Sequence, residues 1–178
     1  MLTIAEKNEG FWTLAPAERR VAVAHDVIAR LDAHEIAPRR GFYAEPPLAL
    51  FNEGGELAPE EEDAKCVVCA IGAAAVSVFD GEVIGRRGIE MVRRLDDEGV
   101  FTRDDLRAME RVFEQNMVRP SDLGTDFAEY GDVLYFPDEE PGSVMRRVYQ
   151  NIIDHDGAFV IRPLAEESLL LWREANPT

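Results

Sequence analysis

The sequence is poor in the residues that several protein classes require. Only Cys66 and Cys69 among its 178 residues are cysteines, so it has no disulfide framework of the kind that stabilises small secreted domains. No apolar run approaches the roughly 18 residues that a membrane-spanning helix needs. The first residues combine neither a basic segment nor a long apolar core, so they do not resemble a signal peptide. We therefore expect a cytoplasmic protein without a membrane span.

Positive charge is also scarce. The chain has 19 Lys and Arg residues against 35 Asp and Glu, a formal net charge of −16, and only Lys7 and Lys65 are lysines. A chain this acidic is poorly suited to bind a nucleic-acid backbone or an anionic membrane directly, because both require clustered cations. With 46% hydrophobic and 30% charged residues, the composition is nevertheless that of a globular protein. Its length predicts a single domain, residues 1–178.

Apolar residues recur at helical spacing along most of the chain. The pattern predicts a mainly α domain of six or seven helices with little β structure. The clearest predicted helices cover residues 16–35, 66–79, 84–95, 143–154 and 163–175, and a further helix starts at Thr102. The Pro- and Gly-rich stretch 38–65 predicts a long irregular loop.

Particular residues are expected to end these helices or face their cores. Thr13 is the expected N-cap of the first helix, and Thr102 with Asp105 forms a variant of the capping box. Gly99 and Gly157 are natural C-terminal stops. On the first helix Asp26 and Arg30 fall on the polar side, and on the helix over 84–95 Ile89 is expected to face inward.

The uncharged run 66–79 contains the strongest candidate for chemistry, Cys66-Val-Val-Cys69. Two thiols at this spacing at a helix start can form a redox pair, because the helix dipole lowers a thiol pKa. They could instead bind zinc together with His25 and His34, or Cys69 could act as a nucleophile with His155 as its base. The interpretation we favour is that both cysteines pack as small apolar side chains. We accordingly expect no cofactor.

Arginines occur in three adjacent pairs, Arg86-Arg87, Arg93-Arg94 and Arg146-Arg147. Such pairs can form a local anion site, but ion pairs with the surplus carboxylates are the interpretation we prefer. No phosphate-binding glycine loop, dinucleotide fingerprint or His-Glu-x-x-His motif occurs in the sequence.

Several segments resemble small uncharacterised proteins of tailed phages and bacteria. The resemblance covers the helix from Val21, the Arg40-Gly-Phe-Tyr43 loop, Cys66-Val-Val-Cys-Ala-Ile-Gly-Ala73, Met109–Glu114 and Tyr149–Asp154. Its most specific part is the Cys-Ala-x-Gly-Ala core. The resemblance implies a phage or mobile-element origin, and it transfers no catalytic residue.

The charge leads to an expectation about partners. A small acidic protein can occupy a cationic surface on another protein, including one that normally holds nucleic acid, and net charge steers its association. We expect a non-enzymatic interaction protein that binds a basic protein surface, such as a host nucleic-acid-binding or defence complex, as a nucleic-acid mimic or blocker. The alternative is a cysteine- or zinc-dependent enzyme or redox protein. The candidate contact residues are Glu53, Glu56, Glu60, Glu61, Glu62, Asp63, Asp138, Glu139 and Glu140.

Overall fold

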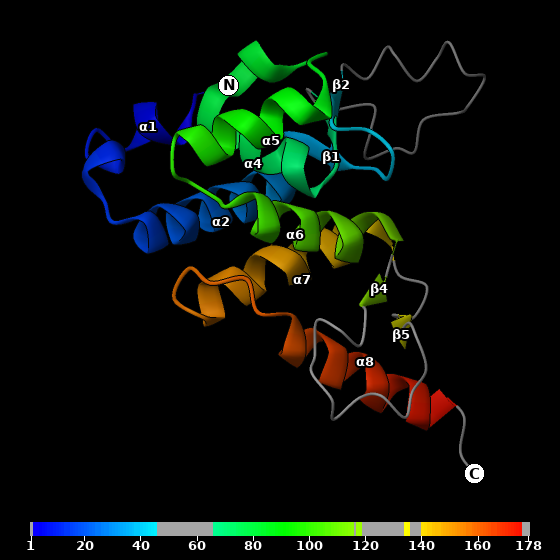
Figure 1. The fold of residues 1–178 in the computed structure, drawn as a ribbon. Helices are drawn as coiled ribbons and strands as arrows, with labels where there is room; N and C mark the ends of the chain where they lie inside the picture. The colour runs from blue at the N-terminus through cyan, green and yellow to red at the C-terminus, as the bar shows by residue number, and fades with distance from the viewer. Residues whose placement is uncertain (1, 46–65, 116, 119–133, 136–139, 176–178) are drawn as a thin grey trace, which may run out of the picture.

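Helices make up most of the part of the chain that the computed structural model describes, which is residues 2–45, 66–115, 117–118, 134–135 and 140–175 (Figure 1). The α-helices in these residues are α1 (Ile4–Lys7), α2 (Pro16–Asp32), α4 (Ala70–Phe79), α5 (Gly88–Asp97), α6 (Arg103–Gln115), α7 (Pro141–Asp154) and α8 (Ile161–Ala175). Two short 3₁₀ helices, η1 (Phe11–Thr13) and η3 (Asp80–Val83), join them. The prediction of a mainly α fold with about six or seven helices is confirmed.

Helix α4 lies at the centre of the packing, and all ten of its residues are buried. It is covered by α5 on one side and by α2 and α6 on the other, while α7 packs beneath α2 and α6 (Figure 1). Its small residues allow this close approach. A Cβ atom at Gly72 would lie 1.2 Å from the backbone oxygen of Tyr43, so only glycine fits there.

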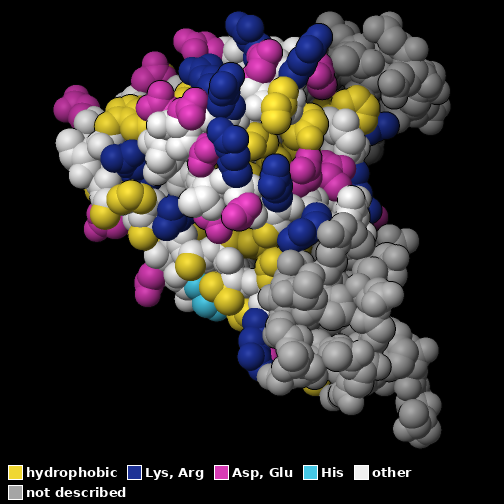
Figure 2. All heavy atoms as spheres, viewed as in Figure 1, with side chains coloured by type: hydrophobic (Ala, Val, Ile, Leu, Met, Phe, Trp, Pro, Cys, Tyr) yellow, Lys and Arg dark blue, Asp and Glu magenta, His cyan; other side chains and the backbone are white. Residues whose placement is uncertain are grey.

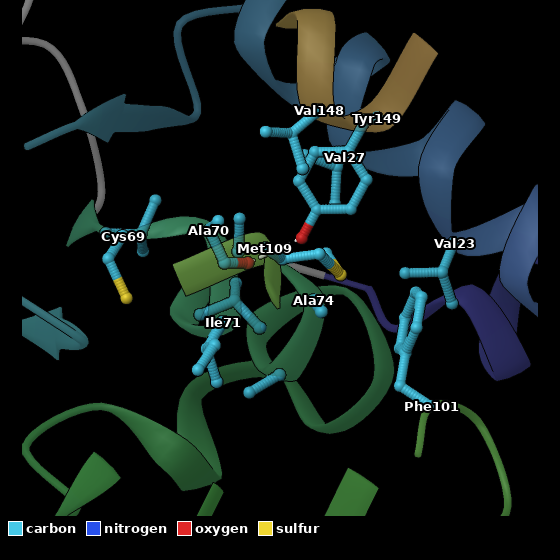
Figure 3. Packing of buried hydrophobic residues seen from close by; sticks show 14 of the residues in the cluster. Val23, Val27, Cys69, Ala70, Ile71, Ala74, Phe101, Met109, Val148 and Tyr149 are labelled. Atoms are coloured by element: carbon cyan, nitrogen blue, oxygen red, sulfur yellow. Dashed lines mark hydrogen bonds between the residues drawn. The ribbon is translucent and has the colours of Figure 1, made fainter. Parts of the chain in front are cut away.

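Side chains from α2, α6 and α7 meet those of α4 in the core (Figure 3). Val23 from α2, Met109 from α6 and Tyr149 from α7 pack against it in this core. Tyr149 is fully buried, and its hydroxyl donates a hydrogen bond of 2.5 Å to the carbonyl oxygen of Ala70. This bond satisfies both buried polar atoms and ties α7 to the start of α4.

The first part of the apolar run is a strand, which corrects the prediction of one helix over 66–79. Strand β3 (Cys66–Val68) lies between β1 (Ile36–Pro38), which is parallel to it, and β2 (Ala44–Glu45), which is antiparallel. The β-branched Val67 and Val68 suit such a fully buried strand. The helix begins only after Cys69, whose extended backbone and sulfur atom cap it.

Of the stretch predicted as an irregular loop, 38–65, the structure describes the end of β1 at Pro38 and the two-residue strand β2, which pair with β3. Residues 46–65 lie outside the described residues. A second pair of strands, β4 (Met117–Val118) and β5 (Leu134–Tyr135), is antiparallel.

Several helix ends lie where the sequence predicts them, and others do not. Thr102 accepts a hydrogen bond of 3.2 Å from the Asp105 N–H and caps α6, as predicted. Gly99 and Gly157 follow α5 and α7 with φ angles of 64° and 88°, the left-handed conformation expected of C-terminal stops. The prediction for Thr13 is wrong, because its hydroxyl donates to the Gly10 carbonyl inside η1.

The N-cap of α2 is instead Ala15, and the helix ends at Asp32 rather than at residue 35. At the N-terminus, the Glu18 carboxylate accepts a hydrogen bond of 2.9 Å from the Ala15 N–H, half of a capping box. At the C-terminus, His34 has a φ angle of 51°, which takes the chain out of the helix.

The polar side of α2 also differs from the expectation, because Asp26 and Arg30 are buried in the core. Arg30 Nε lies 2.6 Å from one carboxylate oxygen of Asp26, and Lys7 Nζ lies 2.6 Å from the other. The Ser77 hydroxyl of α4 donates a third bond, of 2.7 Å, to Asp26. The cluster of Asp26, Arg30, Lys7 and Ser77 therefore joins α2 to α1 and α4.

Helix α5 is rotated relative to the prediction. Its buried residues are Gly88, Met91 and Leu95, whereas Ile89 is 73% exposed. Figure 2 shows Lys and Arg side chains gathered over α5 and α6, with hydrophobic side chains between them. Among the described residues, no helix combines the length and the apolar character needed to cross a bilayer.

Candidate functional site

The two cysteines lie in different elements of the buried centre. Cys66 begins β3 and Cys69 is the N-cap of α4, and neither forms a disulfide. The Gly72 N–H points at the Cys69 sulfur at 3.5 Å, which is the helix-start geometry expected to favour a thiolate.

Burial outweighs that helix-start effect. Burial and, less strongly, the nearby carboxylates of Glu114 and Glu110 raise the pKa of the Cys69 thiol, and hydrogen bonds from Gly72 and Ile71 lower it. The result is a pKa of about 12. Cys69 is 1% exposed. At neutral pH the thiol is therefore protonated, and it lacks both properties that a nucleophilic or redox-active cysteine needs, a thiolate and solvent access.

His155 is placed to serve a helix end rather than Cys69. It is the C-cap of α7, and its Nδ1 atom lies 2.7 Å from the carbonyl oxygen of Asn151. No hydrogen bond joins it to Cys69 among the described residues. A cysteine hydrolase needs the base within hydrogen-bond reach of the sulfur, and this pairing is not built here.

The zinc candidates are not brought together either. His25 is an exposed residue of α2 and His34 is exposed in the turn after it, while Cys66 and Cys69 are buried. Within residues 2–45, 66–115 and the other described parts, no group of three or more His, Cys, Asp or Glu side chains could bind a metal ion.

A polar cluster that the sequence did not indicate surrounds Cys69. The Tyr43 hydroxyl donates a short hydrogen bond to Glu110, and the Gly41 N–H donates a bond of 2.6 Å to Glu114, one turn further along α6. Burial raises the pKa of Glu114, with Glu110 also raising it against hydrogen bonds from Gly41 and Cys69. The cluster ties Gly41 and Tyr43 to α6 and places the carboxylates of Glu110 and Glu114 near the thiol.

Most of the predicted contact acids cannot be placed. Glu53, Glu56, Glu60, Glu61, Glu62, Asp63, Asp138 and Glu139 lie outside the described residues. Glu140 is described, and it is the exposed N-cap residue of α7.

Acidic residues are concentrated in three segments of the sequence. Residues 46–65, 119–133 and 136–139 contain twelve of the 35 acidic residues and two of the 19 basic residues. The described strands at their ends are paired. Glu45 and Val67 are partners in β2–β3, and Val118 and Leu134 are partners in β4–β5. The chain therefore leaves and re-enters the described body at neighbouring positions.

Comparison with known proteins does not add a relative. No family model matches the chain, and no curated protein or solved structure matches it significantly. Function must therefore be argued from the chain itself.

The structure contains two polar groups that sequence reasoning missed. Asp26 and Arg30 are four residues apart, as are Glu110 and Glu114, so each pair lies on one helix face. That spacing was visible in the sequence. Their burial was not, because it depends on Ser77 and Tyr43, which come from distant parts of the chain.

Proposed function

We propose that the protein is a non-enzymatic acidic interaction protein that binds a basic surface on another protein. The observation that carries the proposal is the concentration of twelve acidic and only two basic residues in residues 46–65, 119–133 and 136–139. Acids at this density attract a cationic partner and accelerate its association, more strongly at low salt.

The ion pairs of the described residues also support the proposal. Several of its carboxylates already have partners within the chain. Asp26 bonds to Arg30, Asp32 lies 2.6 Å from Arg146, and Asp96 lies 2.7 Å from Arg103. These acids stabilise helices and their contacts, and the three acid-rich segments carry −10 of the net charge of −16.

The site geometry argues against the enzymatic alternative. Cys69 is buried and its thiol pKa is raised to about 12, and His25 and His34 do not join the cysteines in a metal site. The interpretation of both cysteines as core residues is therefore the better supported one, and a binding function does not require them to react.

The class of partner follows from the charge and from the resemblance to phage proteins. A row of carboxylates can take the place of a phosphate backbone on a protein that holds nucleic acid with Lys and Arg. We propose a host nucleic-acid-binding or defence complex as the partner class, blocked by the acidic segments.

Capture from a bacterial lysate by the tagged full-length protein tests this proposal. The run Glu60–Asp63 is neutralised by the substitutions Glu60→Gln, Glu61→Gln, Glu62→Gln and Asp63→Asn. A matched control removes the same charge from exposed acids of the body by Glu9→Gln, Asp97→Asn, Glu98→Gln and Asp104→Asn.

We expect a basic protein whose capture is lost at high salt and lost in the first variant but retained in the control. Equal capture by both variants would contradict a role for the run. The absence of any salt-sensitive basic partner would contradict the proposed function itself.

A further inference from the structure

A hollow of about 440 Å³ opens on the surface between α5 and α6. Its rim is formed by the first two turns of α5, by residues of α6 and by Tyr43 from the segment before β2. The volume lies within the range of small-molecule sites, about 300–1,000 Å³.

Three arginines line this hollow, although the chain as a whole is acidic. Arg93 makes no hydrogen bond or ion pair with any described residue. Arg103 uses its Nε atom on Asp96 at 2.7 Å, and Arg107 only approaches Asp104, at 4.0 Å, so both retain donors for another group. The guanidinium groups of Arg103 and Arg107 are well exposed, with side chains 55% and 71% accessible.

The start of α5 adds further donors at the same place. Its N-cap residue, Arg87, makes no side-chain capping bond. Gly88 and Ile89 both line the hollow, and their N–H groups make no hydrogen bond within the described residues. Unpaired N–H groups at a helix start favour an anion, and the residues that carry them line the same hollow as the three arginines.

The remaining wall combines apolar side chains with two carboxylates. Ile89 is 73% exposed and lies with Val92 and the Tyr43 ring on the same hollow. The ring packs over Gly88, where an added Cβ would approach its atoms to 2.2 Å, and its hydroxyl donates to Glu110. The rim carries two carboxylates, Glu110 and Glu90. The hydrogen bond from Tyr43 engages Glu110.

We propose that this hollow binds a small organic phosphate, with the phosphate on the arginines and an apolar body against Ile89, Val92 and Tyr43. Guanidinium groups bind phosphate oxygens in a bidentate manner, which suits a dianion shared among several arginines. The net charge of −16 repels an anion at long range. Binding therefore depends on contacts within a Debye length, about 8 Å at physiological ionic strength.

Titration of the full-length protein with phenyl phosphate, followed by calorimetry, tests this site independently of the protein partner proposed above. Inorganic phosphate and phenol serve as the two halves of the probe. We expect saturable binding of phenyl phosphate that is tighter than binding of either half.

The variant Arg93→Gln should weaken binding of phenyl phosphate about tenfold, as expected for a lost charge-assisted hydrogen bond. The matched control is Arg86→Gln, which removes the same charge from an exposed arginine that does not line this hollow. Both positions are exposed, so circular dichroism should show both variants folded.

Absence of saturable binding by phenyl phosphate would overturn the proposal, as would equal weakening by the two variants. Inorganic phosphate binding as tightly as phenyl phosphate would overturn the assignment of an apolar body to Ile89 and Val92.

Discussion

The buried Asp26–Arg30 pair offers the sharpest test of how this fold is stabilised. Replacing Asp26 by Ala would remove the carboxylate that lies 2.6 Å from the buried Arg30 guanidinium. The same change would remove the contacts of that carboxylate with Lys7 and Ser77. Breaking one side of a buried ion pair costs about 3–5 kcal/mol, because the remaining charge stays desolvated. Arg30 keeps a weaker second partner, since its Nη1 atom lies 3.4 Å from Glu35, so we expect a loss toward the lower end of that range. A natural domain has a total stability of about 5–15 kcal/mol.

An exposed pair on the same helix provides the control. Asp32 and Arg146 also lie 2.6 Å apart, but their side chains are 61% and 47% exposed. Exposed ion pairs contribute about 0–1 kcal/mol, so Asp32→Ala should have little effect. The double variant Asp26→Leu with Arg30→Met removes both buried charges and should be more stable than Asp26→Ala alone.

Urea denaturation of the three variants, followed by circular dichroism, measures these differences. If Asp26→Ala lowered the free energy of unfolding by less than about 1 kcal/mol, the reasoning would be refuted. The buried pair would then stabilise the fold no more than the exposed Asp32–Arg146 pair does. A double variant as unstable as Asp26→Ala would show that packing, rather than the buried Arg30 charge left without Asp26, sets the cost.

The pair also predicts a pH dependence. Burial alone would raise the pKa of Asp26, but hydrogen bonds from Lys7, Arg30 and Ser77 outweigh it and lower the pKa below its ordinary value. A carboxyl with a lowered native pKa stabilises the fold above its unfolded pKa, about 3.9. The stabilisation is lost as pH falls through the native pKa. Asp26→Asn should therefore flatten the acid side of the stability profile measured by urea denaturation.

Two further predictions concern Gly88 and Cys69. Gly88→Ala should destabilise the fold by about 1–3 kcal/mol, because the added Cβ would overlap the Tyr43 ring. The control Gly142→Ala places its Cβ in open space on α7 and should leave the stability in thermal denaturation unchanged. Equal effects of the two substitutions would contradict this packing. Cys69 should react with a thiol reagent at neutral pH only after denaturant is added, because its buried thiol has a pKa of about 12; rapid labelling of the native protein would contradict its burial.

The helices were predictable from the sequence where a local signal was strong. Thr102 with Asp105 is a cap within four residues, and Gly157 adopts a conformation that few other residues tolerate, so both helix ends could be read locally. The strand at Cys66–Val68 could not be predicted in this way, because it is defined by its pairing with β1 and β2. Those two strands are too short to show an alternation of apolar and polar residues. An apolar run without polar positions does not distinguish a buried strand from a buried helix.

The candidate site shows the same division between local and distant information. Cysteine spacing indicated a possible reactive pair, but reactivity depends on burial and on neighbouring charge. Here those neighbours are Glu110 and Glu114 from α6, which come some forty residues later in the chain. Likewise the hollow beside Arg93 exists because Tyr43 packs over Gly88, and no pattern within α5 predicts that contact.

The most direct test of the proposed function is the salt dependence of capture by the variant neutralised at Glu60–Asp63 and by its charge-matched control. We predict that a basic protein from the bacterial lysate is retained by the control at low salt, released from it at high salt, and not captured by the neutralised variant. Capture of the same protein by both variants, with no loss at high salt, would contradict the account.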